Sequence, residues 1–117
     1  MSLAALALTA ALLAPQDPVS HQQAVTCTGV FIGVAVMAGA AQEESPSAEN
    51  EELLATAGKL AQAADADRVA AAGREGIALE ASGQAVNAWL EAAVADGSLD
   101  AIQRELEPCL TRYASAL

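Results

Sequence analysis

An uncharged run of 18 residues, from 24 to 41, sets the strongest limit on how this chain can fold. Its sequence is AVTCTGVFIGVAVMAGAA. A stretch this apolar is expected to be buried, either in a protein core or in a membrane. A transmembrane helix needs about 20 such residues, and Gly29 and Gly33 have the spacing at which membrane helices approach closely. However, no Lys, Arg, Trp or Tyr flanks the run to anchor it at an interface. We therefore expect the central core helix of a small bundle, with a self-associating transmembrane helix over residues 24–41 as the alternative.

Alanine decides the type of secondary structure. The chain has 31 alanines among 117 residues and only three aromatic residues, Phe31, Trp89 and Tyr113. Alanine is the strongest intrinsic helix former, whereas strands favour alternating β-branched and aromatic residues, a pattern that is absent after Met37. The length allows a single domain. The sequence therefore predicts an all-α fold, a small antiparallel bundle of about four helices.

The first residues have the pattern of an export signal. Residues 2–14 form an apolar run that is too short to cross a bilayer and has the length of a signal-peptide core. We interpret residues 1–14 as a signal peptide and residues 15–117 as the folded domain. No Lys or Arg precedes the run, as one normally does in a signal peptide, so a short N-terminal helix within the fold is the alternative. A further alternative is cleavage after Ala38-Gly39-Ala40, at the end of a much longer signal.

The start of the first core helix is marked by a capping box. Ser20 is a favoured N-cap, and Gln23 stands three residues later, where its side chain can bond back to the cap. His21 then falls in the first turn, where a cation would oppose the helix dipole. We interpret His21 as an exposed residue without a functional role.

The rest of the chain is predicted to form three more helices. Apolar residues at helical spacing predict one helix over residues 48–64, which Asp65-Ala66-Asp67 would end while supplying the next N-cap. The following helix is predicted over residues 67–96, either as one long helix or broken near Gly83. The last helix is predicted to begin after it, with Ser98 as its N-cap.

The two cysteines are expected to join the first core helix to the last helix. Gly97 fits the left-handed position that closes a helix, so the last helix begins just after it. Its buried stripe, at spacings of three and four, comprises Leu99, Ile102, Leu106, Cys109 and Tyr113. Cys27 lies in the first core helix, and an exported chain with two buried cysteines commonly pairs them. We predict a structural disulfide between Cys27 and Cys109, with two free thiols in a cytosolic protein as the alternative.

Charge and residue counts exclude several classes of function. Fifteen acidic and five basic residues give a net charge of −10, which repels the phosphates of nucleic acid. One histidine and two cysteines are too few for a four-cysteine zinc site or for one of two cysteines and two histidines. The acidic run 42–52 lacks the spacing of a calcium loop. We expect no nucleic-acid partner, no metal and no cofactor, and we find no catalytic constellation. Trp89 is the candidate for a partner-binding surface.

The chain has an apolar start, a cysteine in the first core helix, alanine-rich middle helices and a second cysteine near its end. In these features it resembles small exported single-disulfide helical proteins of proteobacteria. The resemblance covers most of the chain and rests on Cys27, Cys109 and this pattern. We expect a non-catalytic binding or structural protein of the cell envelope, in the periplasm, with an unidentified protein partner. The alternatives are a membrane-anchored protein and, less favoured, a small enzyme, which would need a pocket with converging polar groups.

Overall fold

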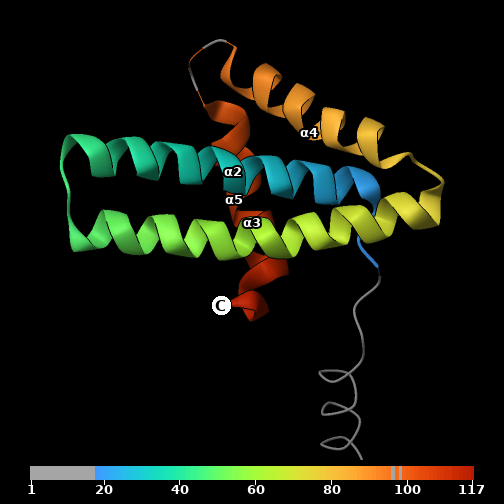
Figure 1. Cartoon of the computed structure of the whole chain (residues 1–117), viewed down its shortest axis with the longest axis horizontal. Helices are drawn as coiled ribbons and strands as arrows, with labels where there is room; N and C mark the ends of the chain where they lie inside the picture. The colour runs from blue at the N-terminus through green and yellow to red at the C-terminus, as the bar shows by residue number, and fades with distance from the viewer. Residues whose placement is uncertain (1–17, 96, 98) are drawn as a thin grey trace, which may run out of the picture.

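Helices make up most of the part of the chain that the computed structural model describes, residues 18–95, 97 and 99–117 (Figure 1). They are α2 (His21–Glu44), α3 (Ala48–Glu75), α4 (Leu79–Val94), α5 (Asp100–Tyr113) and the short 3-10 helix η1 (Ala114–Ala116). No strand occurs among these described residues. The predicted all-α bundle of about four helices with one disulfide is confirmed. The signal peptide predicted at residues 1–14 lies outside the described residues.

The two longest helices, α2 and α3, form an antiparallel hairpin (Figure 1). The capping box predicted for α2 is present, because Gln23 N donates to Ser20 Oγ and Ser20 N donates to Gln23 Oε1, both over 3.1 Å. Ser47 caps α3, since its Oγ accepts a hydrogen bond from Asn50 N at 3.0 Å. Caps at both helix starts fix where the chain enters each helix and so help to set α2 against α3.

The predicted break at Asp65-Ala66-Asp67 is wrong, because α3 continues through it to Glu75. The buried residues of α3 on the two sides of this point are Ala57, Leu60, Ala64, Ala71 and Ala72. Their spacing keeps one helix face in the bundle, so continuous packing outweighs the local preference of aspartate for a cap. The helix ends at Gly76, whose φ of 72° is left-handed. The backbone N–H groups of Gly76 and Ile77 both donate to the carbonyl of Ala72.

The helix predicted over residues 67–96 is therefore wrong as well. Its first part belongs to α3, and after the turn at Gly76 the separate helix α4 runs from Leu79 to Val94 without a break at Gly83. Figure 1 shows α4 on the side of α2 away from α3, diverging from α2 towards its C-terminal end. In the same view α5 crosses the other helices instead of running alongside them. The crossing brings the end of the chain back to the middle of the hairpin.

The link between α4 and α5 contains two left-handed residues. Gly97 has a φ of 72°, as its predicted role in closing a helix requires. Leu99, with a φ of 62°, is the N-cap of α5. Ser98 was expected at this position, and it lies outside the described residues. A left-handed residue other than glycine costs about 1 kcal/mol or more. Packing of the Leu99 side chain against the core offsets this cost.

The core lies where α2, α3 and α5 meet. Phe31 is at its centre, 1% exposed, and its ring meets that of Tyr113 edge to face, with centroids 6.0 Å apart and an interplanar angle of 84°. The other buried members of this cluster are Cys27, Val30, Leu60, Ala64, Ala93, Ile102 and Cys109. Three residues of the whole cluster, Ile102, Cys109 and Tyr113, come from the stripe predicted for the last helix. Because most of these side chains are small, Phe31 supplies a large part of the buried apolar volume.

The uncharged run 24–41 lies within α2, which is the central helix of the bundle as expected. Its buried residues are concentrated between His21 and Gly33, whereas Val36 and Met37 are exposed. By length and composition α2 could cross a membrane, and half of its apolar 18-residue window is buried inside the fold.

Candidate functional site

The disulfide predicted between Cys27 and Cys109 is present. It joins α2 to α5, with the two Cα atoms 5.4 Å apart, and both residues are buried. Bridges of this kind form and persist in oxidising compartments and are rare in the cytosol. Among the described residues no cysteine is free.

Trp89, the predicted partner-binding residue, is half-buried on α4. Its ring lies against the backbone of Gly29, where any added Cβ atom would collide with it. It also lines a shallow pocket of about 290 Å³ beside the disulfide, together with Pro108 of α5. The ring therefore contributes to the contact between α2 and α4, and its role in binding a partner stays a prediction.

His21 is buried, so its interpretation as an exposed residue is wrong. It is 8% exposed, and its Nε2 lies 2.7 Å from Oγ of Ser82, which has no exposed surface. Arg68 Nη1 donates to the same hydroxyl at 2.7 Å, and Arg68 Nε pairs with Asp65 at 2.8 Å. The backbone N–H of His21 donates to Glu75 Oε2 at 2.7 Å. The first turn of α2 is thus covered by residues from α3 and α4, contacts that no local pattern could reveal.

This polar cluster of His21, Ser82, Arg68 and Asp65 holds three helices together. A serine beside a histidine is the starting point of many nucleophilic sites. Here the hydroxyl is enclosed and accepts a hydrogen bond from a guanidinium, which withdraws electron density from the oxygen. Arg68 reaches it because α3 continues past Asp65, which puts Arg68 four residues after the buried Ala64 on the same face. The arrangement suits helix packing rather than attack on a substrate.

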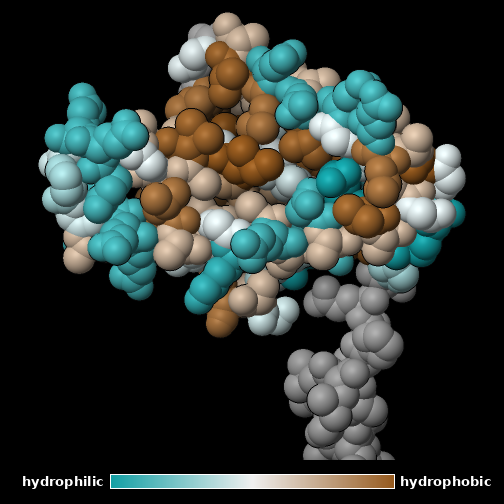
Figure 2. All heavy atoms as spheres, viewed as in Figure 1, coloured by the Kyte–Doolittle hydropathy of each residue, from teal (hydrophilic) through white to brown (hydrophobic). Residues whose placement is uncertain are grey.

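An apolar groove opens between α2 and α4 where the two helices diverge. Its volume is about 290 Å³, and α5 forms its floor. It is lined by Ile32, Gly33, Val36, Met37, Leu90, Glu91, Val94, Leu99 and Ile102. Val36 on α2 is 66% exposed and Val94 on α4 is 48% exposed, so both walls present apolar surface to water. Figure 2 shows hydrophobic side chains gathered over this part of the surface.

Carboxylates stand at the rim of this apolar groove. Glu91 of α4 lines it directly. On α2, Glu43 and Glu44 follow Val36 by seven and eight residues, which places them on the same helix face about two turns further on. Both are exposed, and Figure 2 shows hydrophilic side chains at this end of the hairpin, next to the hydrophobic area. The groove therefore combines an apolar floor with a negatively charged edge.

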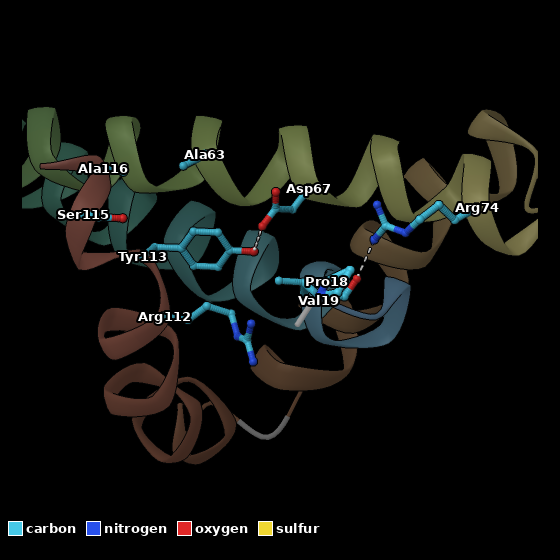
Figure 3. A pocket seen from close by; sticks show the side chains of 9 residues that line it. All are labelled: Pro18, Val19, Ala63, Asp67, Arg74, Arg112, Tyr113, Ser115 and Ala116. Atoms are coloured by element: carbon cyan, nitrogen blue, oxygen red, sulfur yellow. Dashed lines mark hydrogen bonds between the residues drawn. The ribbon is translucent and has the colours of Figure 1, made fainter. Parts of the chain in front are cut away.

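A second, polar pocket lies between α3 and the end of the chain (Figure 3). Its volume is about 380 Å³, and it is lined by Pro18, Val19, Ala63, Asp67, Arg74, Arg112, Tyr113, Ser115 and Ala116. Tyr113 Oη donates to Asp67 Oδ2 at 2.8 Å, and Arg74 Nη2 donates to the carbonyl of Val19 at 2.9 Å. Burial and the hydrogen bond to Asp67 raise the pKa of Tyr113, so the phenol remains a hydrogen-bond donor into the alkaline range.

Of the residues singled out in the sequence, Cys27, Cys109 and Trp89 lie together beside one shallow pocket. The apolar groove and the polar pocket were missed, because each is assembled from helices that are distant in sequence. Compared with known proteins, the chain matches no family model, no curated protein and no solved structure.

Proposed function

We propose that this chain is an exported, non-catalytic helical protein of the periplasm that binds a cationic amphipathic helix of a partner protein in the apolar groove between α2 and α4. The observation that carries this proposal is the open groove itself, with Val36 and Val94 exposed on its two walls. Exposed apolar surface of this kind, edged by polar residues, commonly marks an interaction site.

Charge selects the occupant. A chain with net charge −10 repels a second copy of itself and an anionic membrane surface, and it attracts a cationic partner. Glu91 lies in the groove wall, and Glu43 and Glu44 extend the negative edge along α2. Lysines or arginines beside the apolar face of a bound helix would meet these carboxylates at the rim.

The shape of the groove favours a helix over an extended strand. Its walls are two helices, and a third helix can lay an apolar stripe at positions i, i+3, i+4 and i+7 between them. Both walls are α-helices, so no strand edge is offered to an extended peptide. Met37 adds an adaptable side chain, a type that lets one groove accept related sequences.

The groove is tested with a synthetic amphipathic helix of leucine and lysine, titrated calorimetrically against a scrambled peptide of the same composition. We expect the amphipathic peptide to bind more tightly than the scrambled one. The double variant Val36→Asn/Val94→Asn should weaken it about tenfold, because the apolar walls are lost without a change in charge. Leu79→Asn is the matched control, since Leu79 is 60% exposed and lies at the other end of α4.

The contribution of charge is tested with a second matched pair. Glu91→Gln should weaken the amphipathic peptide a few-fold, whereas Glu80→Gln removes the same charge outside the groove and should leave affinity unchanged. Equal binding of the scrambled peptide, or equal effects within either pair, would contradict the proposal. A dimer in sedimentation experiments that Val36→Asn dissociates would show that a second copy fills the groove instead.

Export is tested by the intact mass of the protein recovered from its host, with and without reduction and thiol alkylation. We expect a chain that lacks about the first 14 residues, as signal-peptide cleavage requires, and two cysteines that react only after reduction. A full-length chain with two free thiols would contradict export. Recovery only in detergent would support instead the alternative in which residues 24–41 span a membrane.

A further inference from the structure

The polar pocket beside Tyr113 gathers positive charge in a chain that has little of it. Of the four arginines, Arg68 pairs with Asp65 and Arg104 with Glu105. Arg74 and Arg112 have no ion pair among the described residues, although the chain carries fifteen acidic side chains. Both of these arginines line the polar pocket. The surplus of acid elsewhere makes this concentration of unpaired guanidinium groups a specific feature of the site.

The hydrogen bonds already made leave several polar groups free to bind a ligand. Arg74 uses one N–H on the carbonyl of Val19, which fixes the chain before α2 at the pocket edge. Asp67 accepts from Tyr113 through Oδ2, and none of the described residues bonds to its Oδ1. Arg112 makes no hydrogen bond within the described part of the chain, and Figure 3 shows its guanidinium extending below Tyr113 and Pro18. Asp67 of α3 and Arg112 of α5 thus both line the pocket.

We propose that this polar pocket binds a small zwitterion, an ω-amino acid, whose carboxylate pairs with Arg112 and whose ammonium group pairs with Asp67. A guanidinium binds a carboxylate through two parallel N–H donors, and an ammonium group donates well to a free carboxylate oxygen. A simple anion would leave Asp67 without a partner, and a simple cation would leave both arginines without one, so a ligand that carries both charges fits this lining best. Ala63, Val19 and Ala116 supply an apolar lining for the methylene groups between them.

The proposal concerns a different surface from the apolar groove and does not depend on it. It is tested with the protein as recovered from its host, by calorimetric titration with glycine, 4-aminobutyrate and 6-aminohexanoate. Acetate and methylammonium serve as probes with one charge each. We expect at least one amino acid to bind about tenfold or more tightly than acetate. Amide resonances of Val19, Ser115 and Ala116 should shift on its addition, because these residues line the pocket.

Two substitutions should abolish this binding. Arg112→Gln removes the carboxylate partner, and Asp67→Asn removes the ammonium partner while keeping an oxygen that can accept from Tyr113. Arg104→Gln is the matched control, because its side chain is 70% exposed and pairs elsewhere. Acetate binding as tightly as every amino acid, or affinity unchanged in both pocket variants, would overturn the proposal. So would the absence of binding and of shifts at the pocket amides, a result that needs only the unmodified protein.

Discussion

Replacing both Cys27 and Cys109 by alanine should remove about 4.5 kcal/mol from the free energy of unfolding. The bridge links residues 82 apart, and chain-entropy arguments assign about this value to a loop of that length. Whole domains of this size are stable by only about 5–15 kcal/mol. Because this chain is rich in alanine, its side chains bury little apolar surface, and we expect its free energy of unfolding to be near the lower end of this range. We expect thermal unfolding followed by circular dichroism to show a midpoint lowered by roughly 20 °C or more.

Reduction supplies the control for this experiment. Adding a thiol reductant should lower the midpoint of the unmodified protein and should not change that of the double alanine variant. Both cysteines are buried, so alanine also loses two sulfur atoms of packing in the variant but not in the reduced protein. A double variant that melts within about 5 °C of the oxidised protein would show that the bridge adds little to stability.

Phe31→Ala is the second substitution with a large expected effect, and it should lower the free energy of unfolding by about 3–5 kcal/mol. Phe31 is 1% exposed at the junction of α2, α3 and α5, and its removal also ends the edge-to-face contact with Tyr113. Unfolding in urea can be followed by fluorescence of the single tryptophan, Trp89. A large cavity is expected because the neighbouring side chains are mostly small and cannot extend to fill it.

Two variants separate this cavity effect from a general loss of apolar surface. Phe31→Leu keeps most of the volume and should cost less than about 2 kcal/mol. Leu79→Ala removes more side-chain volume than that change, but Leu79 is 60% exposed, so its loss should stay within about 0.5 kcal/mol. If Phe31→Ala cost no more than Leu79→Ala, the core would not be centred on Phe31.

Features that depend on near neighbours in the sequence were predicted well. Ser20 and Gln23 are three residues apart, so their capping box needs no tertiary information. Gly97 has the left-handed φ expected of it, and its N–H bonds to the carbonyl of Val94, the last residue of α4. The disulfide was predictable because two cysteines on buried faces allow only one pairing.

The predictions that were wrong concern features that depend on contacts between residues distant in the sequence. Asp65-Ala66-Asp67 has the composition of a cap, but the face that α3 presents to the bundle continues across it. His21 has the sequence context of an exposed first turn, but Ser82, 61 residues later, covers it. One sequence signal for the groove was available. Val36 follows Cys27 by nine residues, and this spacing places Val36 on the opposite face of α2 from the disulfide.

The position of the bridge also governs the order of events as the chain is made. Cys109 lies 82 residues after Cys27, and synthesis proceeds from the N-terminus, so α2, α3 and α4 are complete before the second thiol exists. Until then α2 lacks α5, and its apolar surface has only α3 and α4 to cover it. A chain that stopped short of α5 would leave its central helix incompletely covered and open to aggregation. Oxidation of the cysteines acts as a completion step, since only a chain that has been made through α5 can be closed covalently.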